Sequence, residues 1–263
     1  MTHACISLTA WFKSAALGVH AYEVLSRASA FLAVRSGELY LVSSAHVTHP
    51  FAYPHFFPEK DWLSALNADD LRYSLEVRDA PTGGALHTAR LPALRPLARH
   101  PRADVSAVAL PAGGGGGGGG ALLAALGGGA ASAPRMLARA RPADGAPLTV
   151  HGHSLVPRSG AGGEDTSALL PRVVPAALLG RSPAGQCFLR TAEVLEFGSC
   201  GGPVVDGDGD VVALVEGIVP QAPPRGAGEG SVQARASQLL GGCAVVVEAQ
   251  AIEEALTLAA GAN

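Results

Sequence analysis

The chain has 263 residues, of which 48% are hydrophobic, and a formal net charge of −3 at pH 7. A chain of this length can bury one large core or two small ones. Its 19 lysines and arginines are scattered, which argues against a nucleic-acid-binding surface. No apolar run reaches the roughly 18 residues that a membrane span requires.

The first residues of the chain do not have the pattern of a secretory signal. Residues 1–22 contain one lysine, no arginine and no acidic residue. A secretory signal has a charged start followed by a continuous apolar segment, and this stretch has neither. A partial 3.6-residue stripe of apolar side chains over residues 13–27 predicts a short helix, so residues 1–27 are expected to form a helical lead-in.

Short β-prone runs follow this segment. Residues 31–34 and 39–42 flank a Ser-Gly pair, which is a hairpin signal. Residues 71–77 alternate apolar and polar side chains, as a half-buried strand does, and residues 104–110 form another apolar run. We therefore expect a first β-barrel over residues 28–112.

A glycine tract separates this region from the rest of the chain. Residues 113–120 are eight consecutive glycines, and glycine and alanine dominate as far as Pro134. Such a composition is typical of a flexible linker, here assigned to residues 113–146. Further β-prone runs predict a second barrel over residues 147–247, and an apolar stripe predicts a C-terminal helix over residues 248–263.

Three local motifs carry the chemistry. Residues 198–203 read GSCGGP, in which glycines allow the backbone to double back so that N–H groups converge beside Cys200. Upstream, residues 44–47 read SAHV at the end of a β-prone run, and residues 104–108 read DVSAV. The order along the chain is therefore histidine, aspartate, cysteine.

These motifs resemble those of the chymotrypsin-fold proteases, most closely the HtrA/Deg subgroup, in which the same three motifs occur in the same order. The resemblance implies an all-β fold class, a double antiparallel β-barrel with a C-terminal helix. Most members have serine where this chain has Cys200, although viral proteases of this fold use cysteine. No PDZ-like segment follows the second barrel, which departs from many members of the HtrA/Deg subgroup.

The resemblance also assigns roles to individual residues. Cys200 would be the nucleophile, His46 its general base and Asp104 the group that orients the imidazole. The backbone N–H groups of Gly198 and Cys200 would form the oxyanion hole. Val194, six residues before the nucleophile, would lie at the base of the specificity pocket, and an apolar base favours an uncharged substrate side chain.

Several residues have alternative interpretations. Ser199 is a competing nucleophile, and His151 and His153 form a possible metal pair without supporting ligands. Asp206 begins a segment that resembles part of a calcium loop, although a hairpin turn fits it better. The aromatic and proline cluster at residues 49–58 either lines a groove or packs as a loop.

The hypothesis from the sequence is a cysteine endopeptidase without a cofactor, acting on polypeptides. The alternative is an inactive homologue that binds peptides or partners on the same scaffold. With Cys200 as nucleophile, three cysteines remain, an odd number for a disulfide framework, so we expect an intracellular, reducing compartment. The sequence does not indicate an oligomeric state.

Overall fold

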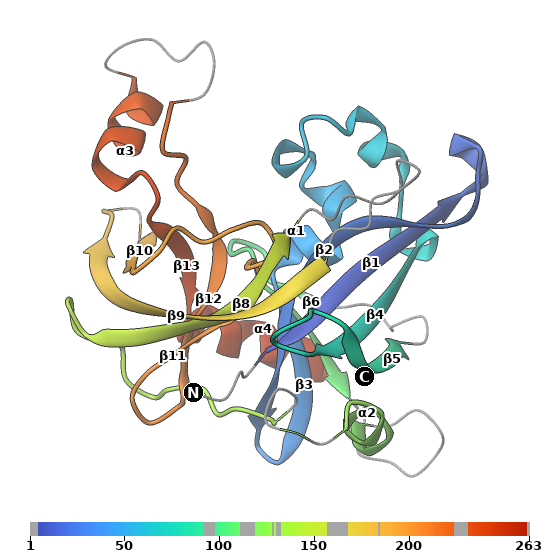
Figure 1. Cartoon of the computed structure of the whole chain (residues 1–263), viewed down its shortest axis with the longest axis horizontal. Coiled ribbons are helices and arrows are strands. Elements are labelled where there is room, and N and C mark those ends of the chain that lie inside the picture. Colours follow the sequence, from blue (N-terminus) through green and yellow to red (C-terminus); the bar gives the residue numbers. More distant parts are fainter. Residues whose placement is uncertain are drawn as a thin grey trace.

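The computed structural model describes residues 5–91, 98–110, 119–127, 129, 133–156, 168–183, 185–223 and 231–261. Two antiparallel β-structures lie side by side, one from each half of the chain (Figure 1). The expected all-β fold with a C-terminal helix is confirmed: the C-terminal half is a closed barrel, and the described strands of the N-terminal half form an antiparallel sheet. No helix among these residues has both the length and the hydropathy needed to cross a membrane.

The N-terminal half forms a seven-stranded sheet in the order β5-β4-β1-β2-β3-β7-β6. Its strands are β1 (Ile6–Ser14), β2 (Val19–Arg35), β3 (Glu38–Ser43), β4 (Leu71–Arg78), β5 (Ala85–Leu91), β6 (Ala98–Arg99) and β7 (Ser106–Leu110). The long strand β2 joins two parts of the sheet, because its first part pairs with β1 and its last five residues pair with β3. Five short 3-10 turns complete this half: η1 (Ala15–Leu17), η2 (Pro50–Ala52), η3 (Pro54–Phe56), η4 (Asp61–Ala65) and η5 (Ala68–Asp70).

The C-terminal half is a closed barrel in the order β10-β13-β12-β11-β8-β9. Its strands are β8 (Pro147–Val156), β9 (Ala168–Arg181), β10 (Cys187–Thr191), β11 (Pro203–Val205), β12 (Val211–Ile218) and β13 (Ala244–Glu248). The helices are α1 (Ala45–Thr48), α2 (Gly119–Ala125), α3 (Val232–Leu240) and α4 (Ala249–Gly261). Closure leaves no unpaired edge in this barrel.

The helical lead-in expected over residues 1–27 is wrong. Residues 13–27 belong to the β1–β2 hairpin, with a single 3-10 turn between the strands. Alternate side chains of β1, from Ile6 to Phe12, enter the core while the strand pairs with β2 on one side and β4 on the other. Pairing with β4, more than 50 residues away in the sequence, places β1 inside the sheet. These contacts outweigh the weak helical pattern of the local sequence. The N-terminal β-structure therefore begins at Ile6 and not at residue 28.

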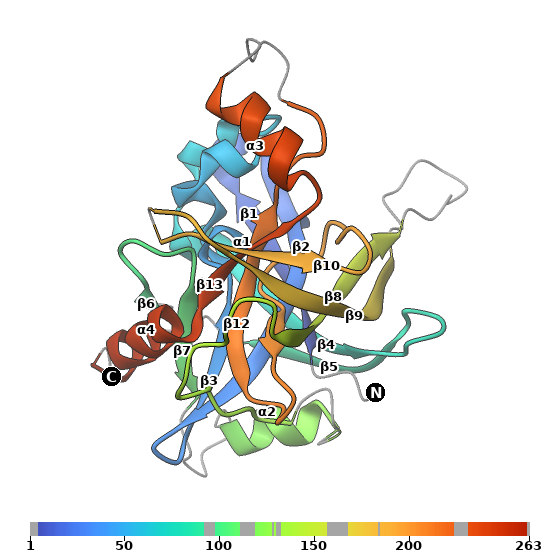
Figure 2. The ribbon, with the colours of Figure 1, turned by 90° about the vertical axis from the view of Figure 1, so that its left-hand side faces the viewer.

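Helix α4 joins the two halves. Its buried face, Ile252, Ala255, Leu256 and Ala259, is the face expected from the sequence. These side chains form one cluster with residues of both halves, including Tyr40 from β3 and Leu214 from β12. Figure 2 shows α4 beside β6 and β7 at the edge of the N-terminal sheet. The helix thus fixes how the halves sit against each other.

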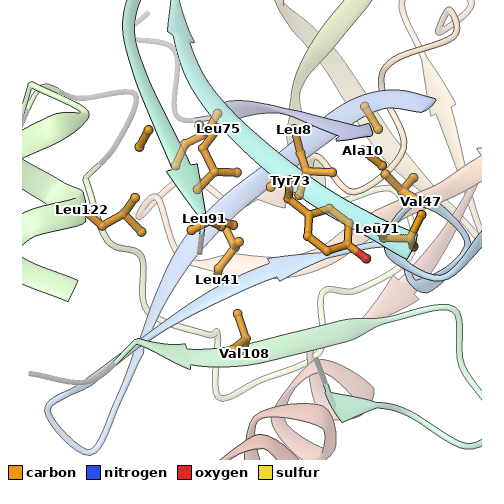
Figure 3. Packing of buried hydrophobic residues seen from close by; sticks show 14 of the residues in the cluster. Leu8, Ala10, Leu41, Val47, Leu71, Tyr73, Leu75, Leu91, Val108 and Leu122 are labelled. Atoms are coloured by element: carbon orange, nitrogen blue, oxygen red, sulfur yellow. The ribbon is translucent and has the colours of Figure 1, made fainter. Parts of the chain in front are cut away.

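The predicted linker contains part of the N-terminal core. Residues 111–118, with most of the glycine tract, lie outside the described residues. Helix α2 follows them and packs beside β5, and its Leu122 points into the cluster of Leu75 and Leu91 (Figure 3). Leu126, one residue after α2, is fully buried in the same cluster. The expectation that residues 113–146 act only as a linker is therefore wrong, because these leucines fill a gap in the core.

Replacement of Leu126 by alanine should lower the free energy of unfolding by about 2–5 kcal/mol, the range measured for buried leucines. The matched control is Leu239→Ala on α3, where the leucine is 78% exposed, and it should change stability by less than about 0.5 kcal/mol. Urea denaturation measures both values. Equal effects for the two variants would show that α2 is not part of the core.

Candidate active site

His46 lies in α1, the single helical turn that directly follows β3. Its side chain is 6% exposed. The backbone N–H of His46 donates to Asp104 Oδ1 at 2.7 Å, and Nδ1 lies 2.5 Å from Asp104 Oδ2. Both carboxylate oxygens therefore bind the same residue. This arrangement keeps a proton on Nδ1 and leaves Nε2 for another partner.

Cys200 interacts with the same imidazole. It is half-buried in the turn between β10 and β11 and packs against the core of the N-terminal half. Burial opposes a charge on His46, but the hydrogen bond to Asp104 and then the hydrogen-bonding and charge interactions with Cys200 raise the pKa of His46 to about 10. The structure thus brings together the three residues that the motifs singled out, from two different halves of the fold.

The other candidate nucleophile faces away from this group. Ser199 is 4% exposed, and its hydroxyl donates to the carbonyl of His153 in β8 at 3.2 Å. Its hydroxyl thus anchors the turn to β8. The remaining cysteines, Cys5, Cys187 and Cys243, are free and buried.

Glycines allow the turn around Cys200 to fit between its neighbours. A Cβ on Gly201, whose φ is +79°, would lie 2.2 Å from the carbonyl oxygen of Ser29 and 2.4 Å from Ser43 Oγ. A Cβ on Gly202 would lie 2.2 Å from the carbonyl oxygen of His151. Because backbone atoms form most of these contacts, no side chain can be accommodated without moving a strand.

Replacement of Gly201 by alanine should therefore lower the free energy of unfolding by roughly 2–4 kcal/mol, through both the clash and the positive φ. Gly207 offers a matched control, because a Cβ there would meet nothing within 4 Å. Thermal and urea unfolding of the two variants would measure the difference. A Gly201→Ala protein as stable as Gly207→Ala would contradict the close packing of the turn.

Two backbone N–H groups of the turn, those of Gly198 and Cys200, have no hydrogen-bond partner among the described residues. Each of these N–H groups shares a peptide unit with the carbonyl of the preceding residue. The carbonyl of Phe197 accepts a hydrogen bond from the N–H of Leu155 at 2.7 Å, and the carbonyl of Ser199 accepts one from the N–H of Gly202 at 3.0 Å. In a trans peptide the N–H points opposite to the C=O. Both N–H groups are therefore directed away from these anchors, and such a pair can bind an oxyanion.

Glu216 is a site residue that the sequence did not reveal. It is the extra residue of a β-bulge in β12, between Val215 and Gly217. Burial, and then the negative charge of Asp104, raise the pKa of Glu216 to about 7, while His46 acts in the opposite direction. Asp104 and Glu216 also line one cavity of about 390 Å³. The only sequence signal is a carboxylate in an otherwise apolar strand.

The raised pKa of Glu216 makes stability depend on pH. The protonated carboxyl is favoured in the folded state, so its contribution is fully present below pH 4.5 and is lost as the pH rises through about 7. Glu216→Gln should match the wild type at pH 4 and be more stable at pH 8 by roughly 1–3 kcal/mol. Urea unfolding at several pH values tests this, with the exposed Glu23→Gln as control. A constant difference across pH would contradict the prediction.

Val194 is 48% exposed and lies close to Gly242, where an added Cβ would be 3.3 Å from its Cγ2. Gln221 lies beside the same glycine. Phe197, three residues before Cys200, is 85% exposed. The segment before the turn thus exposes the apolar Val194 and Phe197 together with the acidic Glu193 and Glu196.

Part of the aromatic cluster at residues 49–58 covers His46. The rings of Phe56 and His46 are stacked, with centroids 4.3 Å apart and an interplanar angle of 11°. Phe51 and Phe57, in contrast, pack against the N-terminal core. The packed-loop interpretation therefore applies to Phe51 and Phe57, while Phe56 covers His46.

The described residues contain no group of three or more His, Cys, Asp or Glu side chains that could hold a metal ion. His151 and His153 are buried in β8, and His153 Nδ1 lies 3.0 Å from Ser29 Oγ. Asp206 Oδ1 accepts bonds from the backbone N–H groups of Asp208 and Asp210, both at 3.0 Å. Its carboxylate is thus used to close a hairpin turn.

Comparisons with known proteins give fold-level similarity alone. No protein-family model and no curated protein matches the sequence. Among solved structures, the active form of the Rv3671c protease from M. tuberculosis is similar at 15% identity and a TM-score of 0.49, covering 97% of this chain and 79% of that chain. An inactive form of the same protease gives 15% identity and a TM-score of 0.47, with 95% and 87% covered. The function is argued below from the geometry of this chain.

Proposed function

We propose that this protein is an endopeptidase with a trypsin-like fold that uses Cys200, His46 and Asp104 as its catalytic triad. The observation that carries the proposal is the placement of one imidazole between a carboxylate and a thiol. Asp104 binds the Nδ1 side of His46, and Cys200 interacts with the same ring. A buried histidine held in this way can accept the thiol proton and return it later.

The chemistry follows from these positions. The Cys200 thiolate attacks the carbonyl carbon of the scissile peptide, and the oxyanion binds to the N–H groups of Gly198 and Cys200. The protonated His46 gives its proton to the leaving amine, which departs as the thioester forms. His46 then removes a proton from water, which hydrolyses the thioester and releases the acid product.

The substrate side chain before the cut is proposed to be uncharged. Val194, Gly242 and the neutral Gln221 lie together near the turn. A charged side chain would find no opposite charge among these three residues to replace its water. The subgroup likeness to HtrA/Deg and a reducing, intracellular compartment stay predictions from the sequence.

Replacement of Cys200 by alanine should lower peptide cleavage by at least about 10³-fold, because it removes the nucleophile. Cys200→Ser should retain little activity, since an alkoxide is much harder to form than a thiolate. Cleavage of a diverse peptide library, followed by mass spectrometry, gives both the rate and the preferred residue. The matched control is Cys243→Ala, which replaces a buried cysteine outside the site.

The same experiment measures the alkylation of Cys200 by iodoacetamide. Alkylation should be rapid in the wild type and slow in His46→Ala. If the wild type cleaves no peptide in the library and Cys200 alkylates no faster than a free cysteine, the endopeptidase proposal is wrong. The inactive, peptide-binding homologue would then be the better description of this chain.

A further inference from the structure

Phe56 stacks on the face of the candidate catalytic histidine. The two rings are nearly parallel and close, at 11° and 4.3 Å between centroids. Phe56 belongs to η3, in which Pro54 occupies the first position, and its side chain is 38% exposed. It is absent from the hydrophobic clusters of the core, whereas Phe57 packs against one of them. Its other ring contacts are with Tyr53 and His55 of the same loop, at 6.2 Å and 4.6 Å between centroids and tilted by 60° and 43°, so the nearly parallel contact with His46 differs from them.

Electrostatics favour this geometry when the imidazole is protonated. The face of an aromatic ring carries a partial negative charge, so two neutral rings prefer offset or edge contacts, while a cation within about 6 Å of the centroid is attracted. Because His46 is largely buried, water solvates its positive charge poorly, which strengthens such an attraction.

The other charged groups around the ring come from three elements. Asp104 lies before β7, Cys200 in the turn before β11 and Glu216 in β12. Beyond them, Tyr53 interacts with Asp104 and Glu216, and its ring lies 5.6 Å from the guanidinium of Arg99. The first three of these groups can stabilise a positive charge on the His46 imidazole from its edge or from farther away. Phe56 stacks on the face of the ring.

We propose that Phe56 is a positioning residue that stabilises the protonated His46 imidazole by stacking on its face, and so maintains the thiolate–imidazolium pair with Cys200. This inference rests on the proposed function, because the protonated imidazole matters for catalysis only if His46 is the general base for Cys200. Phe56 also keeps the ring plane fixed while the proton moves between Cys200 and the leaving amine.

The test is an NMR titration of His46 in the intact protein, with the His46 signal assigned by its loss in His46→Ala. Phe56→Leu keeps an apolar side chain but removes the ring, and should lower the titration midpoint by about 0.5 to 1.5 pH units. Phe56→Tyr, which keeps an aromatic ring, should have a titration midpoint close to that of the wild type. Phe57→Leu is the matched control, because that ring is tilted by 50° at 6.3 Å and should leave the midpoint nearly unchanged.

A second series guards against effects of altered packing. Fluorinated phenylalanines at position 56 keep the ring shape and progressively reduce the negative charge of its face, so the midpoint should fall stepwise with fluorine number. An unchanged midpoint in Phe56→Leu and in the fluorinated series would overturn the inference, even if peptides are cleaved. A stepwise fall without any peptide cleavage would support the stacking and would count against the endopeptidase proposal.

Discussion

The close contact between the turn at Cys200 and strand β2 is the constraint on which the site depends. Ser29 of β2 donates its backbone N–H to the carbonyl of Cys200 at 2.9 Å and its hydroxyl to the carbonyl of Gly198 at 2.7 Å. Gly201 lies so close to the same residue that it can carry no side chain. The proposed nucleophile, Cys200, is thereby fixed against the half that contains His46, at a closely packed contact that has little freedom to move.

Given that contact, the electrostatics around His46 are consistent with the thiol proposed as nucleophile. Burial alone would keep His46 neutral, but Asp104 and Cys200 together outweigh it. A cysteine can supply a negative partner for the imidazolium at ordinary pH, whereas a serine hydroxyl cannot. Glu216 adds a second carboxyl near the first, and its pKa is raised mainly by burial and then by the negative charge of Asp104. Asp104 and Cys200 thus favour the protonated form of the His46 imidazole.

The sequence predicted the parts of this site that local patterns encode. The glycines around Cys200 and the residues that follow β3 and precede β7 mark sharp changes of chain direction, which sequence shows directly. It did not predict β1, because pairing with the distant strand β4 decides that conformation. Nor did it reveal Glu216 or the stacking of Phe56, because a bulge and a contact across loops leave no periodic pattern. The leucines of α2 were missed because glycines surround them.

The separation of the candidate catalytic residues between two halves makes the interface itself a part of the candidate site. Arg135 bridges to Ala33 of β2, and Leu137 bridges to Val211 of β12, so the segment between the halves is bonded to both. The buried face of α4 fills the same interface from the other side. A small shift of one half would move Cys200 relative to His46 while leaving each half folded. Residues such as Leu256, which touch neither reacting group, therefore help to set the distance on which proton transfer depends.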